Sequence, residues 1–342
     1  MKQKKVLGFA ALSGMLLLIL DSSAGLAGAS DGIQLCINVV IPSLFPFFFL
    51  SAILRSAFSG STIRPLQGIG RKLGIPSGYE SILFLSFLGG YPVGAQAVAA
   101  AWKEGGLQTD SAKRLLTFCS NAGPAFIFGM LSTQFHSPLV PWFLWGIHIF
   151  SAILVGFLIH NGSDSTGITA NKGNITPKTD IQSILKSSIQ VMSVVCGWVV
   201  LFRMLIAILN KWAAANIPGI LKVAVAGILE LTNGCTMLTS IPSVSVRFIL
   251  CSALLAFGGI CICLQTASIV GTLSIKNYID GKILQSLISI IISWVVCLFL
   301  FPSELNLPWP FPLFLSILLS VFIFFTRRKN ANRCGNSIGC DV

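Results

Sequence analysis

The residue best suited to chemistry in this chain is a glutamate that stands inside an apolar segment. The stretch GILELTNGCTML, residues 227–238, places Glu230 just before Thr232, Asn233 and Gly234. An acidic side chain at the centre of a membrane costs about 2.5–3.5 kcal/mol on insertion scales, and such residues usually mark the path of an ion or substrate. We expect Glu230 to carry a coupling proton or to bind a cation. The structural alternative is a protonated Glu230 that caps the backbone amides of Thr232 or Asn233.

The other reactive residue types do not form recognisable sites. Eight of the ten cysteines lie inside apolar runs, where they act as small apolar residues. Cys334 and Cys340 are too badly spaced for a zinc site, and the three histidines, His136, His148 and His160, share no metal-ligand spacing. The chain also has no HExxH motif, nucleophile elbow or phosphate loop. We therefore expect no enzyme, no metal site and no cofactor.

The composition is that of a polytopic, all-α membrane protein. Of the 342 residues, 54% are hydrophobic and 10% are charged, whereas soluble domains carry about 25% charged residues. The mean hydropathy is +0.84. The net charge of +12 could indicate a nucleic-acid partner, but no soluble segment interleaves basic and aromatic residues. The excess of Lys and Arg is instead explained by positive-inside orientation, so the expected partner is the lipid bilayer.

The positions of the charges predict how the chain crosses the membrane. The chain contains ten apolar segments, counting the one at the N-terminus. We interpret two of them, 80–101 and 219–240, as re-entrant helical hairpins, which leaves about eight transmembrane helices. This topology puts 19 of the 23 Lys and Arg residues, Lys282 among them, on the inner side with both termini. A topology in which every run spans also places both termini inside but moves the Lys103–Arg114 cluster outside. The remaining predicted spans are 33–54, 112–134, 139–160, 182–208, 246–272, 283–301 and 310–326.

The same topology divides the chain into an inverted repeat. Residues 33–160 and 182–301 each contain a span, a hairpin, an interrupted span and a further span, in that order but with opposite orientation. Inverted repeats around broken helices are typical of secondary transporters. A polar cytoplasmic linker, 161–181, joins the two repeats. Residues 1–32 form an N-terminal helix or signal anchor, either cleaved or retained, and 302–342 add a C-terminal helix and a basic tail.

Four interruptions of apolar helix are expected, two in each repeat. Because broken backbone cannot face lipid, it must contact protein or line a wet cavity. The alternative is that these glycines and prolines only allow close helix packing and that the amide side chains only join helices. The interruptions are FLGGYPVGAQ with Gly89, Gly90, Pro92, Gly94 and Gln96; CSNAGPAFIFG with Ser120, Asn121, Gly123 and Pro124; ELTNGC at 230–235; and AFGGICICLQTAS with Gly258, Gly259, Gln265 and Thr266.

The segment from FLGGYPVGAQ to NAGPAFIFG resembles the Gate, or nucleoside-recognition, domain of the YlbJ-like sporulation integral membrane proteins. It carries GYPVGA, then KR-LL, then NAGP and FI-G, in that order. The segments IPSLFPFF (41–48) and ELTNGC also match the pattern of that family. The resemblance covers about residues 33–300. More remotely, the layout is similar to concentrative nucleoside transporters, with two hairpins and two broken helices around a midplane site.

This resemblance implies a transporter that moves dipicolinic acid into the forespore, across its outer membrane. Nucleoside transporters typically carry a polar, acidic tip on the first hairpin, whereas this tip reads Gly-Gly-Tyr-Pro and favours an anionic substrate. Alternatives are a nucleoside transporter and a non-transporting membrane scaffold for spore assembly. Glu230 would couple to a proton or sodium, and the oligomeric state stays open. The implied substrate site comprises Gly89, Gly90, Tyr91, Pro92, Gly94, Gln96, Ser120, Asn121, Gly123, Pro124, Thr232, Asn233, Gly234, Gln265 and Thr266.

Overall fold

The computed structural model describes residues 2–58, 63–135, 137–159, 180–213, 218–301 and 320. All regular elements in this part of the chain are helical, which confirms the predicted all-α class. Nearly all of the predicted linker and of the C-terminal helix at 310–326 lies outside the described residues, as do His136, His160, Cys334 and Cys340.

Five helical segments are long and apolar enough to cross a membrane. Each coincides with a predicted span, so a multipass membrane protein is confirmed at this level. The total of eight spans stays a prediction, because the run at 112–134 is divided into short pieces and the first helix has only a short apolar part, Ala11–Leu20. The five segments are Ser22–Leu54, Val140–Ile159, Ile181–Trp212, Val244–Val270 and Lys276–Leu300.

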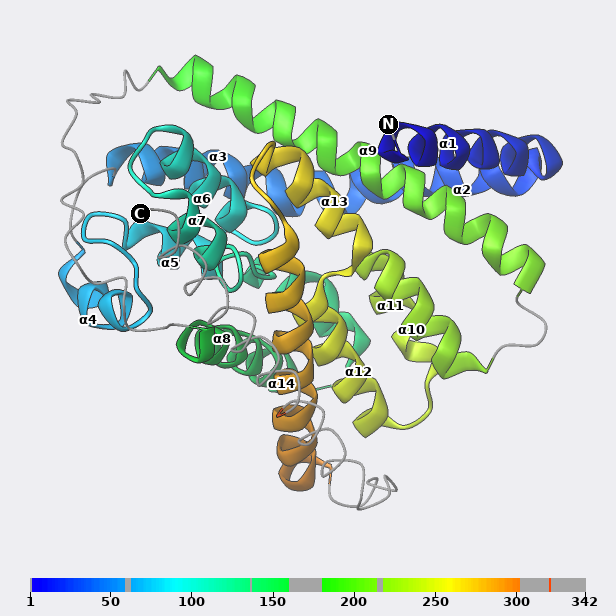
Figure 1. Cartoon of the computed structure of the whole chain (residues 1–342). Helices are drawn as coiled ribbons and strands as arrows, with labels where there is room; N and C mark the ends of the chain where they lie inside the picture. The colour runs from blue at the N-terminus through cyan, green and yellow to red at the C-terminus, as the bar shows by residue number, and fades with distance from the viewer. Residues whose placement is uncertain are drawn as a thin grey trace, which may run out of the picture.

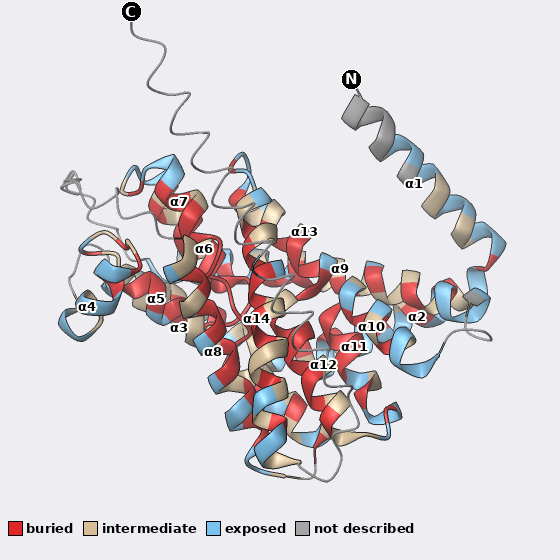
Figure 2. Cartoon of the chain, turned by 60° about the horizontal axis from the view of Figure 1, so that its bottom comes forward, coloured by how far each residue is buried: buried red, intermediate tan, exposed pale blue. Residues whose placement is uncertain are grey.

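The elements of the first half follow one another in the predicted order. Helix α1 extends away from the rest of the chain (Figure 2), and α2 continues through a π-helical turn, η1, into α3, so the first long apolar helix begins before residue 33. Two further short elements, η2 and η3, replace the later part of the predicted span at 112–134. The bounds are α1 Lys2–Leu20, α2 Ser22–Leu35, η1 Cys36–Val40, α3 Ile41–Ala57, α4 Arg64–Lys72, α5 Ser81–Leu88, α6 Val93–Lys103, α7 Thr109–Leu115, η2 Ala125–Met130, η3 Leu131–Gln134 and α8 Val140–Ile159.

The second half repeats this sequence of elements. A long helix, α9, is followed by the short pair α10 and α11, by the interrupted helix α12–α13 and by α14. Each half therefore has a long helix, a helical pair, a broken segment and a final helix. The opposite orientation of the halves in a membrane stays a prediction. The bounds are α9 Ile181–Ala213, α10 Gly219–Leu229, α11 Leu231–Met237, η5 Leu238–Ser240, α12 Val244–Phe257, α13 Gly259–Val270 and α14 Lys276–Leu300.

Both predicted hairpins are pairs of short, mutually packed helices. In the first, α5 and α6 have 8 and 11 residues; in the second, α10 and α11 have 11 and 7. At 1.5 Å per residue these helices are about 10–17 Å long, whereas the hydrocarbon core of a bilayer is about 30 Å thick. None of the four is long enough to cross alone, which is the geometry that a re-entrant hairpin requires.

Corresponding elements of the two halves pack against each other. Helix α9 lies along α2 and α3, and α14 packs against α8 and α12 (Figure 1). The tips of both hairpins and both interruptions are thereby enclosed between these long helices. The buried residues gather around α6, α12 and α14 (Figure 2), so the site described below lies at the centre of the fold.

The contact between α2 and α9 depends on a row of glycines. A Cβ atom added at Gly28 would lie 2.7 Å from the Cβ of Ala207 and 2.8 Å from the Cα of Met204. Such small residues let helices approach closely where no hydrophobic effect drives them together. At the end of the same interface, Lys211 donates to Asp21 at 2.7 Å, and this ammonium lowers the pKa of the Asp21 carboxyl to about 2.

We expect Gly28→Ala to destabilise the protein by about 1–3 kcal/mol, because overpacking at a close backbone contact must push α2 away from α9. The measurement is the unfolding temperature of the purified protein in detergent. Gly197→Ala is the matched control, since a Cβ there meets nothing within 4 Å. Equal stability of the two variants would contradict the close packing of α2 on α9.

Candidate functional site

The tip of the first hairpin, Gly89–Pro92, contacts the helix interruptions of both halves, one near Gly123 and one near Gly258. Gly90 has a φ of +76°, and a Cβ atom there would lie 3.2 Å from the backbone nitrogen of Gly123. The hydroxyl of Tyr91 donates to the carbonyl oxygen of Leu255 at 3.1 Å. That carbonyl belongs to the last turn of α12, which ends at Gly258, where the helix leaves its carbonyls without intrahelical partners. Tyr91 therefore caps the broken helix of the other half.

The tip of the second hairpin is Glu230, whose extended backbone separates α10 from α11. Its carboxylate accepts from the backbone nitrogens of Thr232 at 2.9 Å and Asn233 at 2.7 Å. These are amides of the first turn of α11, so Glu230 is the N-cap of that helix. The structural role considered as the alternative is therefore present. A coupling role for the same carboxylate stays a prediction.

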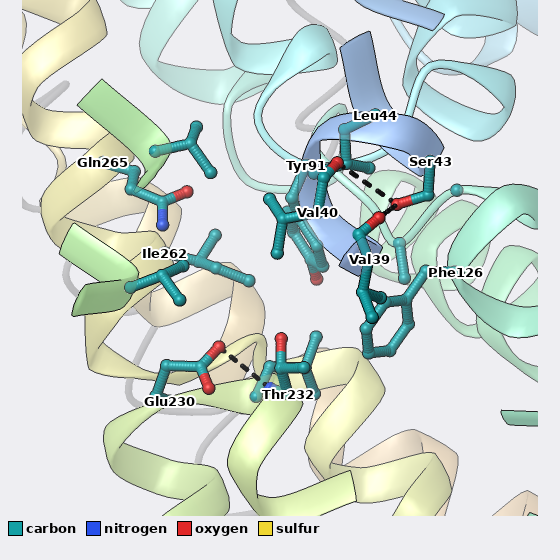
Figure 3. A pocket seen from close by; sticks show the side chains of 15 residues that line it. Val39, Val40, Ser43, Leu44, Tyr91, Phe126, Glu230, Thr232, Ile262 and Gln265 are labelled. Carbon is teal, nitrogen blue, oxygen red and sulfur yellow. Dashed lines mark hydrogen bonds between the residues drawn. The ribbon is translucent and has the colours of Figure 1, made fainter. Parts of the chain in front are cut away.

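A pocket with a cavity volume of about 60 Å³ lies between the two tips. Figure 3 shows Gln265, Ile262 and Glu230 on one side and Val39, Ser43 and Phe126 on the other. Five predicted site residues line it, together with residues of η1, α3 and α9 that the sequence reasoning missed. The predicted lining residues are Tyr91, Gly123, Glu230, Thr232 and Gln265.

The other predicted site residues do not line this pocket. A Cβ at Gly94 would collide with the carbonyl of Cys119, and one at Gly234 would meet Gly227, so both glycines allow close backbone packing. Gln96 lines a second hollow between α6, α9 and α13. The remaining ones are Gly89, Gly90 and Pro92 in the first tip, Ser120, Asn121 and Pro124 in the first interruption, Asn233 in α11 and Thr266 in α13.

Asn121 instead belongs to a buried network around a lysine. Lys282, on α14, is fully buried, although its position at the start of an apolar run placed it at the inner membrane border. The sequence reasoning counted Lys282 among the charges of the inner side and did not foresee its burial inside the protein. Its position relative to a membrane stays a prediction. Lys282 Nζ donates to Asn121 Oδ1 at 3.2 Å, Tyr91 Oη at 3.3 Å and Gln285 Oε1 at 2.6 Å.

The network also supports the nonhelical segment that follows α7. Gln285 Nε2 donates to Asn121 Oδ1 at 3.2 Å and to the carbonyl of His148 at 3.1 Å. The backbone nitrogen of Ala122 donates to His148 Nε2 at 2.9 Å. His148 of α8 thus gives the Ala122 amide the acceptor that a helix would have supplied, and Gln285 of α14 holds the Asn121 side chain beside it, which is the support that buried irregular backbone needs.

We expect Glu230→Ala to lower the unfolding temperature markedly, because each buried amide left without an acceptor costs about 1–3 kcal/mol. Glu230→Gln should fall between this variant and the wild type, since its one amide oxygen can replace only part of the cap. Asp110→Ala is the control: Asp110 forms an exposed pair with Lys113, and such pairs contribute little. A Glu230→Ala protein as stable as the control would contradict the capping role.

Comparison with known proteins finds a relative at the level of sequence. The chain is similar to the sporulation integral membrane protein YlbJ of Bacillus subtilis (strain 168), being 23% identical over 308 residues, with 77% of this chain and 75% of the relative covered. No protein-family model and no solved structure matches the chain. The more remote similarity to concentrative nucleoside transporters is not shown and stays a prediction. The predicted resemblance to the YlbJ sporulation protein is confirmed.

Proposed function

We propose that this protein transports a small anionic metabolite across a membrane during sporulation, with dipicolinic acid as the leading substrate. The observation that carries the proposal is the pocket between two hairpin tips and two helix interruptions, lined from both halves of the chain. The similarity to a sporulation protein gives the setting.

The arrangement of the elements supports alternating access. The first half contributes residues of η1, α3, the first tip, the first interruption and η2 to the pocket wall, and the second half contributes residues of α9, α11, α13 and the second tip. A movement of one half against the other would therefore open and close the pocket, as in transporters built from inverted repeats. The two hairpins are suited to act as gates, because neither is long enough to cross the membrane.

The polar groups around the pocket support an anionic aromatic substrate. The carboxylate of Glu230 already accepts two backbone hydrogen bonds, which offset its negative charge. On the other side, the ammonium of Lys282 lies 3.3 Å behind the Tyr91 hydroxyl and gives that wall a positive charge. Gln265 and Thr232 supply polar side chains, and Phe126 and Leu44 supply apolar surface for a ring.

Uptake into proteoliposomes tests the proposal directly. We expect wild-type protein to accumulate dipicolinate, and we expect Ile262→Trp to reduce the initial rate by about tenfold or more, because the larger ring fills a pocket of this size. Ile260→Trp is the matched control: Ile260 lies on the same helix but is 39% exposed, whereas Ile262 is 8% exposed and lines the pocket. Similar uptake by both variants would place the substrate elsewhere.

The same vesicles separate the alternatives. Excess uridine should leave dipicolinate uptake unchanged, whereas strong competition would favour a nucleoside transporter. For a membrane scaffold, wild-type vesicles would show no uptake above empty ones. A scaffold would also let Ile262→Trp support spore formation fully, provided that the protein accumulates.

Glu230→Gln tests ion coupling separately from stability. If the carboxylate carries the coupling proton, the variant should bind dipicolinate but no longer accumulate it against its concentration gradient. A neutral amide cannot take up and release a proton near neutral pH. Measured with equal amounts of folded protein, full accumulation by this variant would remove Glu230 from the coupling mechanism and leave it as a helix cap.

A further inference from the structure

The surroundings of Lys282 Nζ have the form of a cation site. Three neutral oxygens lie around the nitrogen, at 2.6 Å for Gln285 Oε1, 3.2 Å for Asn121 Oδ1 and 3.3 Å for Tyr91 Oη. The nitrogen is also 5.1 Å from the ring centre of Tyr91 and 5.9 Å from that of Tyr278. Aromatic faces at this range attract cations through their quadrupoles.

No carboxylate in the described part of the chain forms an ion pair with this ammonium. The other titratable groups that face it are His148 on α8, Cys119 after α7, Cys263 on α13 and Tyr278 on its own helix. A buried charge without a counterion is costly, and such groups within membrane segments usually serve function.

The three oxygens come from three separate elements. Tyr91 belongs to the tip of the first hairpin, Asn121 to the first interruption and Gln285 to α14. The ammonium therefore ties a hairpin tip and an interruption of the first half to a helix of the second half. Hydroxyl and amide oxygens are also the ligand types that hard cations take in proteins.

We propose that this cluster, which we call the Lys282 cage, is a monovalent-cation site that the protein fills with its own ammonium. The cage holds the first hairpin to the second half, so no free metal ion is needed there. This role rests on the proposed transport function and extends it, since the Lys282 ammonium would be the cation that holds the first hairpin in place. The cage itself can be tested without transport.

Chemical rescue of a truncated lysine tests the cage. Lys282→Ala removes three methylene groups and the ammonium, which propylammonium can replace. We expect this variant to unfold at a lower temperature than the wild type in detergent, and we expect millimolar propylammonium to recover most of that shift. A thiol-reactive dye can follow unfolding, since the protein has buried free cysteines. Lys276→Ala is the matched control, because Lys276 lies on the same helix in a partly exposed pair with Asp280.

Propanol separates charge from simple cavity filling. It has the same length as propylammonium but no charge, and we expect it to give no recovery. Equal recovery by propanol, or none by propylammonium, would overturn the proposal. Lys282→Met keeps the approximate volume of the side chain but removes the charge, and its stability is measured if the alanine variant does not fold. A methionine variant with wild-type stability would show that the charge is not needed.

Uptake assays add a second readout and keep the two proposals distinct. Lys282→Met vesicles should take up dipicolinate more slowly than Lys276→Ala vesicles, and equal rates would show that the cage does not secure the first hairpin during transport. If wild-type vesicles show no uptake at all, the transport function fails, while the rescue of stability by propylammonium still decides whether the cage exists.

Discussion

The structure depends on satisfying the backbone where helices stop inside an apolar protein. An unpaired amide or carbonyl at that depth has no water to bond, so each interruption needs a partner from elsewhere in the fold. The described part of the chain provides one at three of the four interruptions. Tyr91 donates to the freed carbonyls of α12, Glu230 accepts from the freed amides of α11, and His148 accepts from Ala122.

These partners match the polarity of the helix ends that they meet. The N-terminal end of a helix presents amides and partial positive charge, and it receives the carboxylate of Glu230. The C-terminal end of α12 presents carbonyls, and it receives the hydroxyl donor of Tyr91. The chemical difference between the two hairpin tips, one acidic and one not, is thus first a consequence of which helix end each tip must cap.

The sequence predicted the positions of the interruptions well because glycine, proline and polar residues inside an apolar run are a local signal. The helical pairs at 80–101 and 219–240 and the breaks near 120 and 258 are all present.

The contribution of η1 and α9 to the pocket was missed, because Val39, Val195 and Val199 cannot be told from other buried apolar residues by type. The burial of Lys282 was missed because a charge at the edge of an apolar run is usually the sign of the end of a span. A subtler signal was available: Tyr278, Lys282, Gln285, Ser289 and Ser293 recur at helical spacing and form one buried polar face of α14.

The two hairpin tips are held in different ways, as the contacts of Glu230 and Tyr91 show. The second tip is fixed within its own half, since Glu230 caps the next helix and Gly259 lies against Gly227 and Ile228. The first tip is fixed across the two halves, because Tyr91 bonds to Leu255 and Lys282. A relative movement of the halves can therefore carry the second hairpin along unchanged, but it must break or transfer the bonds of Tyr91. Since Tyr91 also lines the pocket, the same side chain forms part of the pocket wall and joins the two halves.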